Sequence, residues 1–159
     1  MKIGIVCYPT FGGSGVVATE LGLEMAALGH QVHFITYSRP VRLDTSLPNI
    51  FYHEVVVTDY PLFDYSPYEL VLTSSLVRVV KREQLDLLHV HYAIPHASAA
   101  YMAKKILLEE GIDLPTICTL HGNSAQSVTV TNNLSASSPC FSQKHTRSVS
   151  SRSILSCAY

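Results

Sequence analysis

The segment Gly12-Gly13-Ser14-Gly15 is the first place in the sequence where residue types and spacing suggest chemistry. It lies between an apolar run typical of a buried strand, residues 2–7, and a stretch with helical spacing. Glycines let the backbone approach a ligand closely, and the first N–H groups of a helix carry partial positive charge. The segment therefore predicts a phosphate site, although a tight turn that only suits helix packing has the same composition.

The same loop also fits the dinucleotide-binding fingerprint G-x-G-x-x-A, from Gly13 to Ala18. Tyr101 and Lys105 have the Y-x-x-x-K spacing of short-chain dehydrogenases, so an NADP-dependent oxidoreductase is an alternative. Two observations disfavour it. No acidic residue follows the second apolar run to hold a ribose diol, although Arg39 suits a 2′-phosphate. Tyr101 and Lys105 also lie in a stretch typical of a half-buried helix face.

Histidines form a second group. His89 and His91 alternate along one apolar run and so share a face of the predicted strand. His96 follows after Pro95, and His121 follows a later run. Hydrogen bonding to a substrate is the preferred interpretation, because no nearby carboxylate supports a metal site. Cys7 and Cys118 lie in apolar runs, where cysteine behaves as a small hydrophobic residue rather than a nucleophile.

These residues must be positioned by alternating strands and helices. Strands are predicted over residues 2–7, 31–36, 51–57, 85–91 and 114–120. Helices are predicted over 14–28, 67–83 and 95–110, the second with Leu70, Val71, Ser74, Val77 and Val80 on one side. This alternation predicts an α/β, Rossmann-like parallel sheet with helices on both faces. Ligands of such sheets bind at the carboxyl ends of the strands. The glycine loop, Tyr37 and the histidines lie at or just after these ends.

Composition limits the class of protein. With 159 residues, of which 47% are hydrophobic and 14% charged, the chain fits one globular domain. A net charge of −1 argues against nucleic-acid binding, and no apolar run reaches the roughly 18 residues of a membrane span. Four cysteines without a C-x-x-C pair favour a reducing, cytoplasmic compartment.

The character of the sequence changes near Gly122. All twelve acidic residues lie at or before Asp113, whereas residues 123–159 contain none and hold eleven serines. A folded domain is therefore expected over residues 1–122, followed by a Ser-rich tail at residues 123–159. The tail is either a disordered extension or the product of a shifted reading frame.

The motifs YP-x-x-GGSG, HYA-x-PHA and TLHG, in this order, resemble the retaining GT-B glycosyltransferases of family 4. The resemblance covers essentially residues 1–122 and implies the N-terminal, Rossmann-like half of a GT-B fold, truncated and incomplete. Members of that family continue into a second Rossmann domain that supplies the diphosphate clamp. The abrupt end of the resemblance after TLHG favours a frameshifted or truncated reading frame, and this chain alone is expected to be inactive.

The resemblance implies that the intact enzyme transfers N-acetylglucosamine from UDP-N-acetylglucosamine to the hydroxyl of L-malate, a step of bacillithiol biosynthesis. It implies no cofactor and no metal, a cytoplasmic enzyme, and leaves a homo-oligomer open. Residue by residue, it assigns Gly12, Gly13 and Gly15 to donor binding, Ser14, Tyr92 and Thr119 to malate binding, and His121 to a catalytic position beside the donor sugar. A non-catalytic nucleotide- or anion-binding module, with the tail as a genuine linker, is the alternative.

Overall fold

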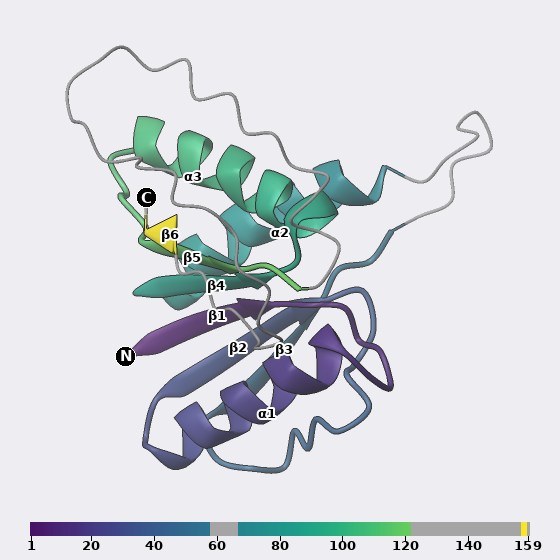
Figure 1. Cartoon of the computed structure of the whole chain (residues 1–159). Helices are drawn as coiled ribbons and strands as arrows, with labels where there is room; N and C mark the ends of the chain where they lie inside the picture. Colours follow the sequence, from purple (N-terminus) through teal and green to yellow (C-terminus); the bar gives the residue numbers. More distant parts are fainter. Residues whose placement is uncertain (58–66, 122–156, 159) are drawn as a thin grey trace, which may run out of the picture.

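The computed structural model describes residues 1–57, 67–121 and 157–158 (Figure 1). The strands are β1 (Lys2–Val6), β2 (Gln31–Thr36), β3 (Ile50–Glu54), β4 (Leu87–His91), β5 (Thr116–Thr119) and β6 (Cys157–Ala158). The helices are α1 (Ser14–Ala27), α2 (Tyr68–Glu83), the short irregular turn η1 (Ala93–Ala97) and α3 (Ser98–Glu109). Apart from β6, the predicted Ser-rich tail at 123–159 lies outside the described residues.

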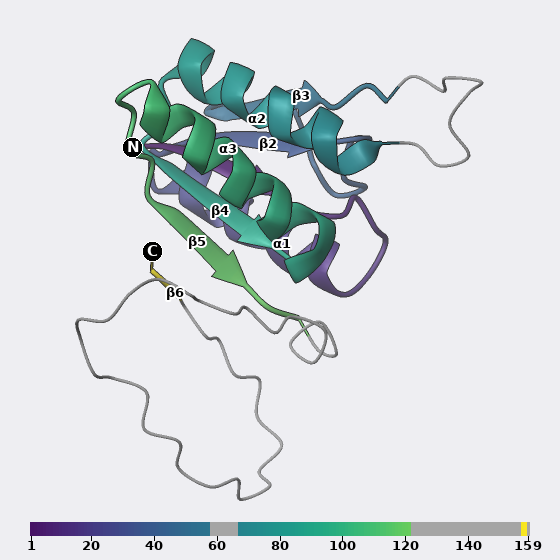
Figure 2. The ribbon, with the colours of Figure 1, turned by 90° about the horizontal axis from the view of Figure 1, so that it is seen from above.

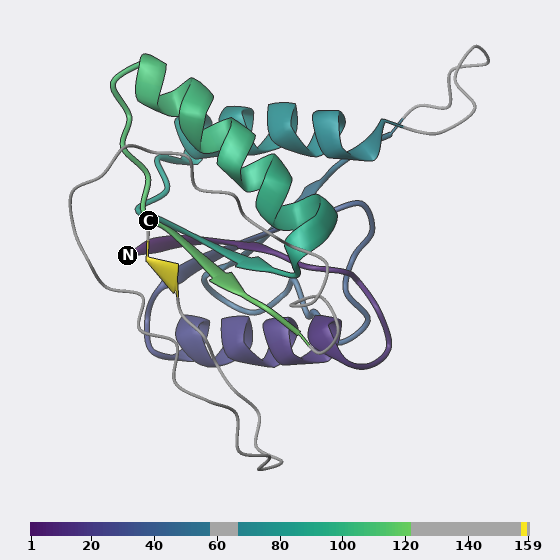
Figure 3. The same ribbon diagram turned by 45° about the horizontal axis from the view of Figure 1, so that its top comes forward.

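The strands form one sheet in the order β3-β2-β1-β4-β5-β6. β1 to β5 are parallel, and β6 pairs antiparallel with β5. Helix α1 covers one face of the sheet, and α2 and α3 lie side by side on the other (Figures 2 and 3). The predicted Rossmann-like α/β sheet with helices on both faces is confirmed. Along the described segments, no helix is long and apolar enough to cross a membrane.

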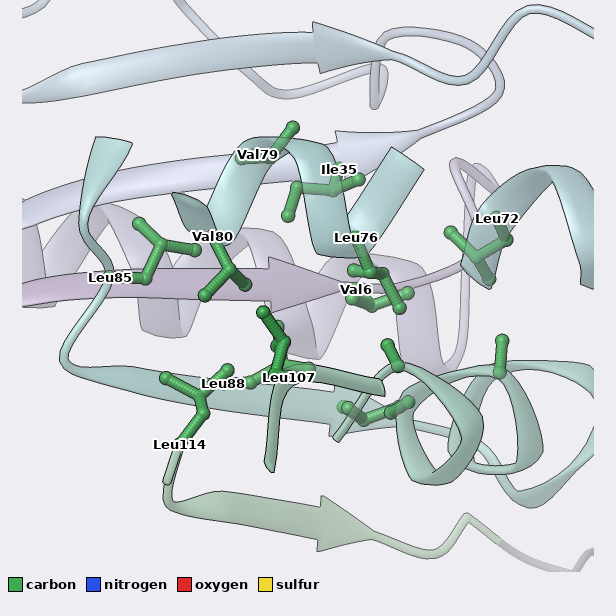
Figure 4. Close-up of a cluster of buried hydrophobic side chains, with 14 of the residues drawn as sticks. Val6, Ile35, Leu72, Leu76, Val79, Val80, Leu85, Leu88, Leu107 and Leu114 are labelled. Carbon is green, nitrogen blue, oxygen red and sulfur yellow. The ribbon is translucent and has the colours of Figure 1, made fainter. Parts of the chain in front are cut away.

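The larger core lies between the sheet and the helices α2 and α3 (Figure 4). It combines Val6 of β1, Ile35 of β2 and Leu88 of β4 with side chains from both helices, such as Leu76 and Leu107. All five of these residues are at most 1% exposed. Burial on this scale holds the central strands in place, and with them the edge where the strands end.

Helix α1 packs on the opposite face through small residues. Its buried positions include Gly22, where a Cβ atom would lie only 2.4 Å from the Phe34 ring of β2. Val17 and Leu28, two larger apolar residues of the segment predicted as a helix, are instead 48% and 77% exposed. Because Phe34 fills the space between sheet and helix, glycine is the residue type that allows their close contact.

The predicted apolar side of α2 is only partly right: Val80 is buried and Val71 and Val77 are half-buried against the core, but Leu70 and Ser74 are exposed. The buried residues of this helix are Leu72, Thr73, Ser75, Leu76, Val79 and Val80. Leu70 is 61% exposed, and Val71 and Ser74 line a shallow surface groove of about 510 Å³ beside Val56. Since α3 packs against α2 in addition to the sheet, the buried stripe is rotated away from the one that spacing alone suggested.

A pair of histidines lies between β2, β3 and α2. His33 is 2% exposed, stacks on the Phe51 ring with centroids 4.6 Å apart, and its Nδ1 is 2.9 Å from Nε2 of His53. The Arg82 guanidinium donates to Nδ1 of His53 over 3.1 Å. Burial, reinforced by the neighbouring His53, lowers the pKa of His33 to about 4, and burial also lowers the pKa of His53. Both rings are therefore neutral at pH 7.

This arrangement predicts a loss of stability in weak acid. The unfolded chain binds a proton at His33 near pH 6.5 and the folded chain only near pH 4, so stability falls as pH drops through that window. Between pH 7 and pH 5 the His33 contribution is about 2 kcal/mol. In urea unfolding at both pH values, we expect His33→Phe to reduce the pH-dependent loss by about that amount. An unchanged loss in the variant would contradict the assignment.

Candidate functional site

The candidate site lies at the edge of the sheet where β1, β4 and β5 end. The glycine loop follows β1, Tyr92 follows β4, and Thr119 and His121 are the last residue of β5 and the second residue beyond it. Helix α1 runs back against the strand direction, so its first residue, Ser14, lies at the same edge (Figure 1). The fold thus gathers residues from three parts of the chain at one edge.

The loop between β1 and α1 is closely packed on one side and open on the other. A Cβ atom at Gly15 would lie 2.3 Å from the Tyr8 carbonyl oxygen and 2.6 Å from Oγ1 of Thr10. At Gly12 and Gly13, by contrast, no described atom lies within 4 Å of that position, and Gly13 has a φ of 63°. Among the described residues, no side chain caps the N-terminus of α1. The free N–H groups and the open backbone beside them suit an anion.

Tyr8 joins the loop to the other two strand ends. Its ring packs edge-on against Tyr92, with centroids 5.3 Å apart, and the Tyr92 ring lies roughly parallel to that of His121 at 6.2 Å. The Tyr92 N–H donates to the Thr119 carbonyl over 3.0 Å. Tyr92 has a φ of 87°, an unusual conformation for a tyrosine, which the packing around it must hold. The structure therefore brings together the glycine loop, Tyr92, Thr119 and His121, all of which the sequence had selected.

Beneath these residues lie two buried histidines of β4. His89 and His91 are 8% and 1% exposed. Nε2 of His89 is 2.8 Å from Oγ1 of Thr119, and Nδ1 of His91 is 3.0 Å from Nε2 of His121. Direct contact with a substrate, which the sequence suggested for these two rings, does not fit this burial. They support the half-buried Thr119 and His121 instead.

Tyr68 was not selected from the sequence as a site residue, and His96 was noted only as a neighbour of His89 and His91. The His96 ring is fully buried, and its Nδ1–H donates to the carbonyl of His91 over 2.8 Å. Its Nε2 is 3.4 Å from the Tyr68 hydroxyl, and its ring lies 4.3 Å from that of Tyr8. Tyr68 starts α2, so this contact ties that helix to the end of β4. The sequence signal for His96 was its place in the motif HYA-x-PHA, which begins at His91.

The titratable groups of the site are held neutral. Burial, aided by its histidine neighbours, lowers the pKa of His91 to about 3. Burial also lowers the pKa of His89, His96 and His121 and raises that of the Cys7 thiol to about 12. In the part of the chain that the structure describes, no three His, Cys, Asp or Glu residues gather as a metal site would require. The arrangement offers hydrogen bonds rather than charges.

The residues behind the oxidoreductase alternative lie elsewhere. Tyr101 is 60% exposed on α3, and the Lys105 ammonium lies over its ring, 5.5 Å from the centroid. Such a cation–π pair on an outer helix face accounts for the Y-x-x-x-K spacing without catalysis. Nothing in their placement connects this pair to the strand ends.

This fold and site define a Rossmann-like domain of the GT-B type. Two solved structures share the fold: the glycosyltransferase from Rickettsia africae ESF-5 and MurG from Acinetobacter baumannii, each with a TM-score of 0.50. Their sequence identities are 16% and 15%; the first alignment covers 74% of this chain and 28% of the other, the second 86% and 43%.

The chain belongs to Glycosyltransferase Family 4, whose profile matches residues 11–151. A curated relative, N-acetyl-alpha-D-glucosaminyl L-malate synthase from Bacillus anthracis, is 54% identical over 122 residues. That alignment covers 77% of this chain and 31% of the relative, so the chain spans about a third of the relative's length. The family resemblance read from the sequence is confirmed. The roles given to single residues, and the boundary at residue 122, remain predictions.

Two glycine substitutions in the loop should have different effects. Gly15→Ala forces a methyl group against the Tyr8 carbonyl and should destabilise the fold by about 1–3 kcal/mol in urea unfolding. Gly12→Ala places its methyl group in open space and should change stability by no more than about 0.5 kcal/mol. Equal losses in the two variants would show that the loop is not packed as described.

Proposed function

We propose that this chain is the N-terminal, acceptor-side domain of a retaining glycosyltransferase that transfers N-acetylglucosamine from UDP-N-acetylglucosamine to the hydroxyl of L-malate. The reaction is a cytoplasmic step of bacillithiol biosynthesis. The single observation that carries the proposal is the open glycine loop at the start of α1, next to Tyr92, Thr119 and His121. The 54% identity to the synthase from Bacillus anthracis supports the choice of both substrates.

In this proposal the glycine loop meets the donor diphosphate. Gly12 and Gly13 leave room for its oxygens, and Gly15 lets the loop fold onto the first turn of α1. The N–H groups of that turn point toward negative charge. None of these residues carries a positive side-chain charge to neutralise the diphosphate. In this proposal the cationic half of the diphosphate clamp therefore belongs to a second domain, and this chain alone does not catalyse transfer.

L-Malate binds beside the loop. The Ser14 and Thr119 hydroxyls and the Tyr92 hydroxyl are hydrogen-bond donors for its carboxylates, and the N-terminus of α1 adds favourable charge. His89 orients the Thr119 hydroxyl from below through its 2.8 Å contact. These residues hold the acceptor hydroxyl close to the donor sugar, and such positioning supplies much of the rate of a transfer between two bound molecules.

His121 contacts the donor sugar in this proposal. Burial lowers the pKa of its imidazole, so the ring is neutral at pH 7 and stabilises the sugar by hydrogen bonding. Neither a protein nucleophile nor a metal ion is required: the departing diphosphate takes the proton of the acceptor hydroxyl as the new bond to the anomeric carbon forms on the same face.

A non-catalytic anion-binding module is the second candidate. The observation in its favour is that this chain alone forms the open loop, which lies between β1 and α1. It predicts saturable binding of UDP to the 159-residue protein, without any effect of L-malate. Calorimetric titration with UDP, L-malate and NADPH separates the candidates, since the oxidoreductase alternative requires NADPH binding.

Transfer itself can be tested in a chimera. Residues 1–121 of this chain would replace the corresponding segment of the Bacillus anthracis synthase, which is 54% identical to it over 122 residues. We expect UDP release that depends on L-malate. Tyr92→Phe removes one hydroxyl donor to a carboxylate and should raise the KM for malate about tenfold. Tyr101→Phe, on the outer face of α3, is the matched control and should leave kcat and KM unchanged.

A folded chimera that accepts no hydroxy acid would rule out the malate assignment while leaving the family membership intact. A Tyr92→Phe variant with an unchanged KM would remove Tyr92 from the acceptor site.

A further inference from the structure

The contacts between β4 and β5 repeat at an interval of two residues. In the ladder, the Cα partner of His89 is Ile117 and that of His91 is Thr119. Each imidazole nevertheless bonds to the side chain two positions beyond that partner, so His89 meets Thr119 and His91 meets His121. Both rings thus lean toward the edge of the sheet and end beneath Thr119 and His121.

His91 is the more deeply placed of the two. It is 1% exposed, and its ring lies between those of His89 and His121, with centroids 4.4 Å and 5.3 Å away. Its Nδ1 faces Nε2 of His121 over 3.0 Å. Its other nitrogen, Nε2, is buried and has no hydrogen-bond partner among the described residues.

The burial of that second nitrogen decides which ring donates. Two neutral imidazoles can share one hydrogen bond in two ways. If His121 donated, the proton of His91 would sit on its buried Nε2, where an N–H group without an acceptor is costly. If His91 donates from Nδ1, only a lone pair is left unpaired at Nε2, which costs less. The second arrangement places the proton of His121 on Nδ1.

We propose that His91 is a positioning residue that holds His121 in its Nδ1–H form. The Nε2 lone pair of His121 is then occupied by His91, and its Nδ1–H can act only as a hydrogen-bond donor. His121 can therefore donate to an oxygen of the donor sugar or of an anion, but neither of its nitrogens can accept a proton from the acceptor hydroxyl. The catalytic meaning of this state rests on the proposed function, whereas the tautomer itself does not.

Electrostatics agree with this geometry. Burial and the adjacent imidazoles lower the pKa of His91 to about 3, so His91 stays neutral at any pH at which the protein would work. A neutral His91 can keep the same hydrogen bond over that whole range.

The tautomer can be read directly in the 159-residue protein. With ¹⁵N-labelled histidine, long-range ¹H–¹⁵N spectra at pH 7.5 distinguish the Nδ1–H from the Nε2–H form of each ring. We expect His121 in the Nδ1–H form, opposite to the form that a neutral histidine favours in water. In His91→Phe, which keeps a ring of similar size, the ratio of Nδ1–H to Nε2–H at His121 should fall about tenfold, the effect of one lost hydrogen bond.

Two further variants separate positioning from packing. The side-chain amide of His91→Asn puts an N–H close to the former Nδ1 position and should restore the Nδ1–H form of His121. His89→Phe changes the neighbouring ring on the same face, whose partner is Thr119, and should leave the tautomer of His121 unchanged.

An Nε2–H form at His121 in the unsubstituted protein would overturn the proposal, even if no variant folds. So would a His91→Phe variant in which the ratio is unchanged. Titration of the same samples with L-malate keeps the two claims apart: an Nδ1–H His121 in a protein that binds no malate would support the role of His91 and count against the proposed acceptor.

Discussion

The parallel register of β1, β4 and β5 is the constraint on which the candidate site depends. Because the three strands run in one direction with matched ends, the residues that follow them meet at one edge of the sheet. The register also pairs His89 and His91 with the residues two positions before Thr119 and His121. Each buried imidazole therefore reaches a residue of the site. A slip of one residue in β4 would turn both rings to the face occupied by α2 and α3.

Close backbone packing holds this edge in shape. The Tyr8 carbonyl lies against Gly15 so tightly that no side chain fits there, and Tyr8 then supports Tyr92 from the side. Tyr92 in turn keeps a left-handed backbone conformation, which is typical of positions held by their surroundings for a function. The loop, the turn after β4 and the end of β5 therefore form one connected surface rather than three independent segments.

In each of two imidazole pairs, a buried histidine shares a hydrogen bond with a half-buried one, but the buried ring accepts in one pair and donates in the other. In the pair between β2 and β3, the charged Arg82 guanidinium can only donate, so it places the proton of His53 on Nε2 and that of His33 on its own Nε2, even though this nitrogen is buried without a partner among the described residues. No cation acts on the pair between β4 and β5 among the contacts described. In the pair between β4 and β5, the direction follows from the burial of Nε2 of His91. The first pair affects stability, because acid must charge rings that are buried neutral. The second reaches the site and determines what His121 can offer to a ligand.

The sequence by itself determined the order of strands and helices, the parallel sheet, the glycine loop and the family, because these depend on local periodicity and short motifs. It did not determine which side of α2 is buried, since that depends on where α3 packs, nor the small-residue contact of α1 with Phe34. It selected Tyr92, Thr119 and His121 but not Tyr8, Tyr68 or the supporting role of His91. Contacts across strands about 30 residues apart carry no local pattern, so only the tertiary structure could decide them.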